Sequence, residues 1–270
     1  NFNRVTDQLT HRAYAQWNWS PNTQHQISLS GQSVITPNKR FTNLQENRVL
    51  TPQYLTQETF TTKSNTEFDT RDYVADMVWQ ATINDNTTAK TTAQYIDYTQ
   101  DQQQRLSSMY YDPFGQNTRN EGFSTSSDQH TIIGLGQIDI HHNSAVAAWD
   151  FGVKGTQVDT KTNWSLTPNS STAIGPVERF DYKEQVAAAY GRMERSFGQW
   201  SIASGLRYEH TQIERLSTQQ ALPELRYENW FPELTLTQEL PGEQSWGLGY
   251  LKKIQRPRYQ SLNPFRYYLN

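Results

Sequence analysis

The composition of the chain excludes several classes of protein. Of its 270 residues, 34% are hydrophobic, below the roughly 45% usual for a soluble domain, whereas 13% are aromatic. Such a content of aromatic residues argues against disorder, and a net charge of −3 provides no basic surface for nucleic acid. The absence of cysteine excludes disulfides and thiolate metal sites, and no apolar run approaches the ~20 residues of a membrane-spanning helix.

Apolar and polar residues alternate along much of the chain, which is the period of a β-strand. The alternating runs last about 9 to 15 residues, longer than the ~5–6 of a soluble strand and close to the ~9–11 of a tilted strand that crosses a bilayer. In two segments, 132–141 and 186–193, the pattern leaves open which face meets lipid. The clearest runs are, in chain order, 13–19, 26–32, 73–82, 149–154, 200–209 and 246–250.

Short polar turns and long intervening segments alternate along the chain. We predict irregular loops at about 36–65, 101–128 and 160–177, with shorter ones at 215–225 and after Arg256. Short turns at one rim and long loops at the other are typical of outer-membrane barrels. The pattern therefore predicts five hairpins, or about ten strands, in an antiparallel up-and-down transmembrane β-barrel. The predicted short turns are 20–23, 84–87, 142–144, 196–199 and 241–244.

Six of the tryptophans lie within about half a dozen residues of a predicted short turn. Tryptophan prefers the boundary between membrane and water, so we interpret these residues as an aromatic girdle at the periplasmic rim. The alternative is the core of a soluble sandwich, although core tryptophans need not gather at one end of every hairpin. The six residues are Trp17, Trp19, Trp79, Trp149, Trp200 and Trp246.

Three C-terminal stretches resemble conserved segments of a known family. The stretch 249–265 contains a basic pair, Lys252-Lys253, then Arg-Pro-x-Tyr and Leu-Asn-Pro-Phe. It is similar to a segment in the barrels of TonB-dependent outer-membrane receptors, and 179–190 and 197–209 are similar to two others. The resemblance is closest to the outer-membrane β-barrel family branch of these receptors, and it is strongest from Arg179 onward.

The resemblance implies a 22-stranded barrel in the outer membrane, with an N-terminal plug inside it. Such a receptor captures a scarce ligand, such as a siderophore, glycan or peptide, and takes it up by energised transport through the TonB system. The chain begins at Asn1 and shows no signal peptide, so we expect residues 1–270 to be a partial barrel domain that lacks the plug and the other strands. A passive porin-like channel is the alternative, and no motif indicates an enzyme or a cofactor.

Candidate ligand-binding residues lie in the predicted extracellular loops. Asp112-Pro113-Phe114-Gly115 is a turn signature, and aromatic residues on such a loop favour binding, although they also pack against neighbouring loops. Arg256 and its neighbours lie where a strand meets the extracellular side. The candidates are Tyr110, Tyr111, Phe114, Trp164, Arg256, Arg258 and Tyr259.

Three clusters of charged residues have alternative interpretations. An omptin-like protease would need His210 with Glu209 and Glu214, although a solvated loop residue is the simpler interpretation. His141 and His142 point to opposite faces of a strand and cannot bind one metal ion together. A lumenal patch for the plug is predicted from the acidic residues Asp69, Asp72 and Asp76 near Arg71, and a polar rim from Arg192, Glu194 and Arg195.

Overall fold

A computed structural model of the chain describes residues 2–169, 177–218 and 223–254. The described residues form one antiparallel sheet of eleven strands, and among them no helix is long and apolar enough to cross a membrane. The strands are β1 (Phe2–Asp7), β2 (His11–Asn22), β3 (His25–Leu50), β4 (Thr56–Asn84), β5 (Thr87–Tyr111), β6 (Asn117–Asn143), β7 (Ala148–Pro168), β8 (Val177–Phe197), β9 (Trp200–Ser217), β10 (Leu225–Leu240) and β11 (Gln244–Leu251).

The sheet is an up-and-down arrangement, as predicted, but its first position holds two strands. Each strand from β3 to β11 pairs with the next one in sequence, whereas β1 and β2 both pair with β3, end to end. A bulge in β3 between Thr36 and Lys39 separates the two pairing regions, and the Asp69 carboxylate accepts the Asn38 backbone N–H there at 2.8 Å. The eleven strands therefore fill ten positions, which explains the predicted count.

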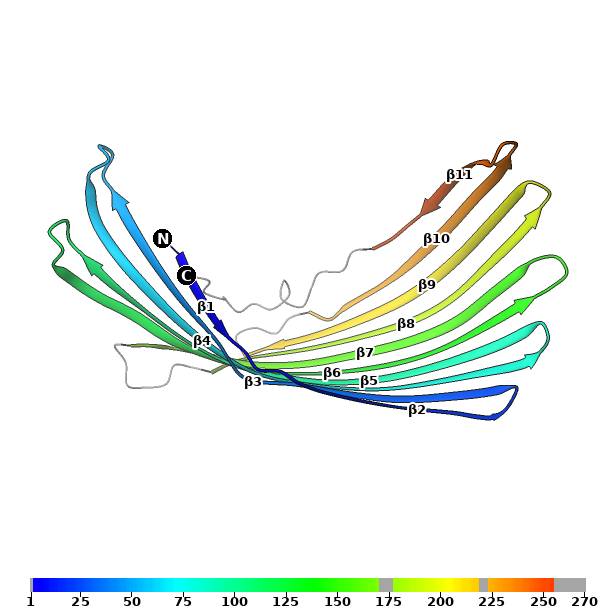
Figure 1. The fold of residues 1–270 in the computed structure, drawn as a ribbon, viewed down its shortest axis with the longest axis horizontal. Coiled ribbons are helices and arrows are strands. Elements are labelled where there is room, and N and C mark those ends of the chain that lie inside the picture. The colour runs from blue at the N-terminus through cyan, green and yellow to red at the C-terminus, as the bar shows by residue number, and fades with distance from the viewer. Residues whose placement is uncertain (1, 170–176, 219–222, 255–270) are drawn as a thin grey trace.

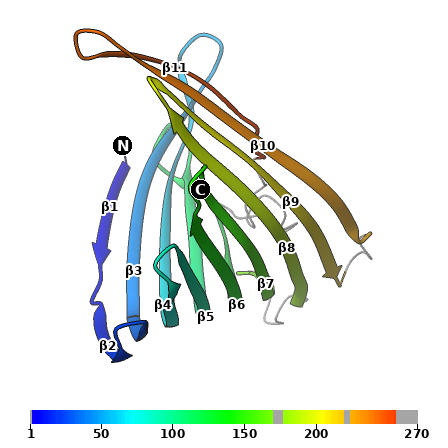
Figure 2. The same ribbon diagram turned by 90° about the vertical axis from the view of Figure 1, so that its right-hand side faces the viewer.

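The described strands form an open, curved wall (Figures 1 and 2). Figure 2 shows the neighbouring strands side by side around a trough, with β1 and β2 at one edge and β10 and β11 at the other. The paired strands of the described residues run from β1 to β11 without β11 pairing back to β1 or β2. The predicted all-β antiparallel sheet is confirmed, and a barrel of 22 strands stays a prediction.

The five predicted short turns are confirmed, and they lie together at one end of the sheet, here called the tryptophan end (Figure 1). At the first turn the Asn22 side chain accepts the backbone N–H groups of Gln24 and His25, both at 2.9 Å. Gly198 has φ +61°, a conformation that costs glycine no steric clash, at the β8–β9 turn. Local side-chain and backbone chemistry thus closes each hairpin without a long loop.

The long loops predicted at 36–65 and 101–128 are wrong. They are mostly continuations of strands, because β3 and β4 are joined only by residues 51–55, and β5 and β6 only by residues 112–116. These four strands contain 25 to 29 residues, or about 80 to 100 Å at ~3.3 Å per residue, more than a bilayer requires. Beyond lipid both faces meet water, so hydrophobic alternation disappears although threonine-rich strands persist.

The predicted loop at 160–177 is strand for about half of its length, whereas the predicted loop at 215–225 is strand only at its two ends. β7 continues to Pro168 and β8 begins at Val177, while β9 continues to Ser217 and β10 begins at Leu225. Residues 170–176 and 219–222 lie outside the described part of the chain. These strands too extend beyond their hydrophobic segments, for the same physical reason.

The pairing register sorts the side chains onto two chemically different faces. Directly paired residues share a face, so Trp79 of β4 lies on the same face as Ile27 of β3, and Ile138 of β6 on the same face as Val153 of β7. Between Thr62 and Trp79 of β4, the side chains of this face are exposed except Asp69, and those of the other face are half-buried or buried, as expected if the other face is the inside of the curve. We call the face that carries Trp79 and Ile138 the convex face, and the opposite face the concave face.

The register also resolves the two ambiguous segments. Ala189 pairs with Val153, and Met193 pairs with Trp149, so the odd-numbered residues of 186–193 lie on the convex face. In segment 132–141, the even-numbered residues from Ile132 to Ile140 lie on the convex face. The alternation alone could not decide this because both faces of these strands carry small or apolar side chains.

Large apolar side chains cover the convex face, where nothing in the described chain packs on them. All six tryptophans lie on this face near the tryptophan end, and their rings contact one another or nearby rings, as in the pair Trp200–Trp246 with centroids 5.6 Å apart. Eight residues farther along β9, or about 26 Å, Tyr208 packs against Trp230 and begins a second aromatic boundary. An exposed apolar band between two aromatic rows matches a lipid-facing surface about 25 Å tall. Exposed members include Leu29, Met77, Ile138, Ile140, Phe151, Val153, Leu206, Leu234, Leu248 and Tyr250.

This assignment of faces predicts that a charge is much more destabilising at one of two adjacent positions of β10 than at the other. Leu234 lies on the convex face and is 43% exposed, whereas Thr235 lies on the concave face. We expect Leu234→Arg to lower the free energy of unfolding in lipid vesicles by about 2–4 kcal/mol, because arginine would enter hydrocarbon. Thr235→Arg, the matched control, should cost less than half as much in the same urea titration. Equal costs would contradict the assignment.

Candidate functional site: the concave face and the hairpin tips

A hydrogen-bonded cluster around Tyr190 crosses three strands on the concave face. The Tyr190 hydroxyl donates to the Asp139 carboxylate, and the Gln137 side-chain amide donates to Asp139 Oδ2 at 2.8 Å and to Tyr190 Oη at 3.0 Å. Tyr190 reaches β6 from β8 because β7 presents Gly152 beneath its ring, where any Cβ would collide with it. Arg207 of β9 lies 5.2 Å from the ring centroid on the other side. The cluster therefore ties four strands together.

A second row of charged side chains crosses the concave face one step nearer the tryptophan end. Arg192 lies 3.1 Å from Glu194, 3.4 Å from Glu233 and 3.9 Å from Asp150, and the ring of His141 lies 2.7 Å from Asp150. Each of these side chains is about half exposed, so each pair contributes little to stability by itself. Their value lies in fixing the positions of charged groups on the inner surface.

The two rows border a cavity of about 470 Å³. Tyr190, Arg192 and Arg207 line it from β8 and β9, and Phe231 and Glu233 line it from β10. Its lining combines carboxylates, guanidinium groups and aromatic rings. Such a surface can pair with a polar protein segment of either charge through fixed donors and acceptors.

An aromatic cluster lies on the concave face toward the opposite end of the sheet. Phe180 is fully buried beside Tyr182 and Ile213, and Trp164 and Tyr227 pack against them. The Tyr182 hydroxyl donates to Glu184 at 2.7 Å, and burial, aided by this bond, raises the pKa of Tyr182 well above its usual range. Trp164, a predicted ligand-binding residue, thus belongs to a packed cluster that anchors β7, β8 and β9.

The predicted loop aromatics occupy three different environments. Phe114, at the tip of the β5–β6 turn, is 89% exposed, and the Asp112 carboxylate accepts the Phe114 backbone N–H at 2.9 Å. Tyr110 stacks on Phe60 with centroids 5.1 Å apart, beneath the guanidinium of Arg119 at 3.7 Å. Tyr110 is therefore a packed residue, whereas Phe114 is free to contact other molecules.

Tyr111 faces away from Tyr110 because adjacent strand residues point to opposite faces. Its hydroxyl lies 3.7 Å from the Met109 sulfur. The structure therefore does not bring Tyr110, Tyr111 and Phe114 into one surface. The remaining predicted site residues, Arg256, Arg258 and Tyr259, lie outside the described residues.

The histidine clusters considered from the sequence do not form a shared site. The Thr87 hydroxyl contacts His142 Nδ1 at 2.9 Å, on the face opposite to His141. His210 lies on the convex face, 3.7 Å from Glu228, whereas Glu209 lies on the concave face with Arg207. Among the described residues, no group of three or more acidic and histidine side chains could hold a metal ion.

The predicted acidic patch is divided between the two faces. Asp76, on the concave face, accepts the Gln94 side-chain amide at 2.6 Å, and Asp72 shares that face. Asp69 and Arg71 lie on the convex face instead. The patch therefore contains two of the four residues proposed for it, because odd- and even-numbered residues of β4 point to opposite faces.

Sequence reasoning missed two residues that connect strands across the concave face, Tyr190 and Glu233. Their partners are far away in sequence, and only the strand register brings them together. One signal was available: Gly152 and Gly205 interrupt strands that otherwise carry side chains, and each lies directly beneath one of these two residues. Glycine inside a strand often marks a close approach by another group.

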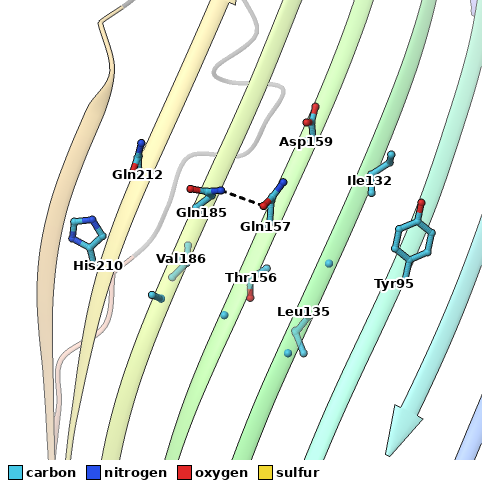
Figure 3. Close-up of a pocket in the computed structure, with 14 residues that line it drawn as sticks. Tyr95, Ile132, Leu135, Thr156, Gln157, Asp159, Gln185, Val186, His210 and Gln212 are labelled. Atoms are coloured by element: carbon cyan, nitrogen blue, oxygen red, sulfur yellow. Dashed lines mark hydrogen bonds between the residues drawn. The ribbon is translucent and has the colours of Figure 1, made fainter.

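The convex face carries a second hollow, of about 580 Å³, shown in Figure 3. Its floor lacks side chains at Gly134, Gly136 and Gly155, and Tyr95 lies at one side. Gln185 donates to Gln157 at 3.2 Å along its upper edge. The second aromatic boundary, formed by Tyr95 and Tyr208 on either side, is thus interrupted across β6, β7 and β8.

The Tyr190 cluster predicts a measurable coupling between strands. Tyr190→Phe removes the hydroxyl bound to Asp139 and should lower the free energy of unfolding by about 1 kcal/mol. Asp139→Asn should cost at least about 0.5 kcal/mol less in the Tyr190→Phe background than in the parent protein, because the two residues share that bond. Tyr95→Phe, on the convex face, is the control and should leave stability unchanged. Additive costs would exclude the coupling.

Comparison with known proteins places the chain in a family. Residues 80–270 match the Outer membrane protein beta-barrel family. The chain matches none of the curated protein sequences with which it was compared.

Two solved structures with a similar fold are receptors. The ferric-catecholate import receptor Fiu of E. coli K12 is 10% identical, with a TM-score of 0.51 over 93% of this chain and 49% of that chain. The ferric preacinetobactin receptor BauA of Acinetobacter baumannii is 8% identical, with a TM-score of 0.48 over 91% and 46%.

The likeness to Fiu shows the fold alone, and the chain spans about half the length of these two structures. The family match covers most of the chain, including β5 to β11. Together with the lipid-facing convex face, it confirms the predicted location: the chain belongs to the Outer membrane protein beta-barrel family and lies in the outer membrane.

Proposed function

We propose that the chain forms part of the barrel wall of a TonB-dependent outer-membrane receptor that takes up a scarce ligand by energised transport. The observation that carries the proposal is the concave face, on which fixed charged and polar groups line a curved wall whose outer face suits lipid. The similarity of this wall to about half of the import receptor Fiu supports the same architecture.

The open sheet supports the proposal that residues 1–270 are a partial barrel domain. A free strand edge leaves backbone N–H and C=O groups unsatisfied, and each such group costs several kcal/mol in lipid. The described strands present two such edges, at β1 with β2 and at β11. Further strands, up to the expected 22, would pair with these edges and close the barrel.

The concave network supports a plug domain as the inner partner. Arg192, Arg207 and Glu233 surround a cavity that opens on the inside of the wall, and their positions are fixed by neighbouring side chains. A plug segment with complementary charges would find these donors and acceptors already oriented. The TonB system would then act on the plug, while the wall holds it in place.

The exposed hairpin tips support ligand capture at the other end. Tyr54 is 85% exposed at the β3–β4 turn, and Phe114 is 89% exposed at the β5–β6 turn. These neighbouring hairpins extend beyond the apolar band of the convex face (Figure 1). Of the sequence candidates, Phe114 suits first contact with a ligand, whereas Tyr110 and Trp164 suit the support of the tips. Arg256, Arg258 and Tyr259 remain candidate contacts.

A genetic comparison tests energised transport and does not require the ligand to be identified first. Strains lacking this gene, lacking TonB, or lacking both are grown on a panel of limiting nutrients. We expect the first strain to fail on a subset of the nutrients on which the second fails, and the double deletion to resemble the TonB deletion. An additional defect in the double deletion would indicate a passive channel and contradict the proposal.

The capture role of the hairpin tips predicts a separation of folding from function. Phe114→Ala should leave the urea midpoint unchanged because the ring makes little contact with the protein, yet it should reduce growth on the nutrient identified above. Tyr110→Ala, by comparison, should lower stability, since it removes contacts with Phe60 and Arg119. Unchanged growth with Phe114→Ala would remove this residue from the capture surface.

A further inference from the structure

The concave face of β3 to β7 carries a single charged side chain, Lys39 of β3, over a broad area between the apolar band and the hairpin tips. Register and alternation place seventeen hydroxyl, amide and aromatic residues there. We call this area the neutral wall. Its residues are Phe41, Asn43, Gln45, Thr62, Ser64, Thr66, Phe68, Thr70, Gln100, Gln102, Gln104, Ser108, Thr125, Ser127, Gln129, Thr160 and Thr162.

The strand segments that form the neutral wall do contain charged residues, but nearly all of these side chains point to the convex face. The register-matched stretches of β3 to β7 that carry the neutral wall, 36–45, 62–70, 100–108, 125–129 and 160–162, contain nine acidic or basic residues, and the register places all of them except Lys39 on the convex face. Both faces lie beyond the lipid-facing band at this level, so contact with lipid does not explain the separation. The eight on the convex face are Arg40, Lys63, Glu67, Asp69, Asp101, Arg105, Asp128 and Lys161.

Hydrogen bonds between neighbouring strands hold the hydroxyls of the neutral wall in place. Thr62 and Ser108 share a hydrogen bond of 2.8 Å, and the Gln104 side-chain amide donates to Ser64 at 3.0 Å. Thr160 bonds to Thr131, at the border of the wall, at 3.0 Å. Threonine and serine side chains thus form a buried layer of the wall. The longer side chains of Gln100, Gln102 and Gln129 are only half-buried.

Aromatic rings border the neutral wall on two sides. Phe41 and Phe68 meet edge to face on β3 and β4, with centroids 5.5 Å apart. The cluster of Phe180 with Trp164 lies at the opposite side, from β7 onward. A ligand on the wall would therefore meet polar groups in the middle and aromatic rings at either side.

Charged side chains lie at the margins of the neutral wall. Arg4 of β1 and Lys39, next to the bulge of β3, lie 4.2 Å and 5.0 Å from the centroid of the Phe41 ring. Near the tip, Arg119 forms an ion pair with Glu58 at 2.7 Å. Arg119 is paired with a carboxylate, whereas Arg4 and Lys39 contact an aromatic ring and keep their charge. The wall thus carries two cations at its β1–β3 side and is neutral from β4 to β7.

These features fit one class of ligand. Side-chain amides and hydroxyls each offer both donors and acceptors, as do the hydroxyl groups of a sugar, and aromatic faces suit the apolar faces of sugar rings. An anionic chelate or acidic polymer would instead be matched by arginine or lysine, which the neutral wall lacks from β4 to β7. We infer that the ligand that contacts the neutral wall is an uncharged oligosaccharide. The inference rests on the proposed function, since it names the ligand of the same barrel.

Binding to the purified full-length protein in detergent micelles tests the inference without requiring transport. The neutral probes are maltohexaose, cellohexaose and mannohexaose, and the charged probes are a hexamer of galacturonic acid, a hexamer of glucosamine and ferric citrate. Isothermal titration should detect at least one neutral probe, with every charged probe at least about tenfold weaker. Tighter binding of a charged probe, or binding of no neutral probe, would overturn the inference.

Adjacent residues of β5 provide a matched pair of variants. Gln102 is half-buried on the neutral wall, whereas Gln103 is exposed on the convex face. Gln102→Lys should weaken binding of the neutral probe about three- to tenfold, the effect of losing one hydrogen bond, and Gln103→Lys should not change it. Equal affinities for both variants, with unchanged urea midpoints, would show that this face does not bind the oligosaccharide.

The two proposals fail in distinguishable ways. Binding needs no proton gradient, so a passive channel would still bind the neutral probe and would fail only the comparison with the TonB deletion. A TonB-dependent receptor for a charged ligand would pass that comparison and fail the binding test. A loss of stability in Gln102→Lys with unchanged affinity would assign the neutral wall a purely structural role, and this too would overturn the inference.

Discussion

The requirement that every backbone hydrogen bond be satisfied inside hydrocarbon shapes this protein more than any other constraint. A wall of β-strands satisfies that requirement between neighbours, and a period of two then lets one strand face two different media. Leu234 and Thr235 of β10 are adjacent, yet one lies on the apolar convex face and the other on the polar concave face. The low apolar content follows, because only the convex side of the spanning part needs apolar residues.

This constraint also explains which parts of the fold could be predicted from the sequence. Where a strand has lipid on one side, alternation reveals it, as in the segment from Trp200 to Glu209. Where both sides meet water, as in β4 before Asp72, only threonine content favours a strand, and the residues were interpreted as loops. The bulge at Asn38 and the two-part first position could not be predicted, because they depend on pairing.

The candidate site was less predictable than the fold for a related reason. Phe114 could be identified because the turn chemistry of Asp112 is local in sequence. Tyr190 and Asp139, in contrast, are 51 residues apart, and the ring of Tyr190 must cross Gly152 to reach its partner. The pairing register decides which face a side chain occupies. Charged residues that are close in sequence, such as Asp69 and Asp72, therefore lie on opposite faces.

The strand register shows that the concave face has two chemically distinct levels. Toward the tryptophan end, Arg192 and Glu233 present fixed charges, which would suit the plug segment of the proposed receptor. Toward the hairpin tips, the neutral wall presents groups that exchange hydrogen bonds with water or with sugar hydroxyls at nearly equal cost. Charges at that level would bind an ionic partner strongly and slow its passage. A neutral surface instead allows many weak contacts, which would suit the movement of a ligand in the proposed receptor.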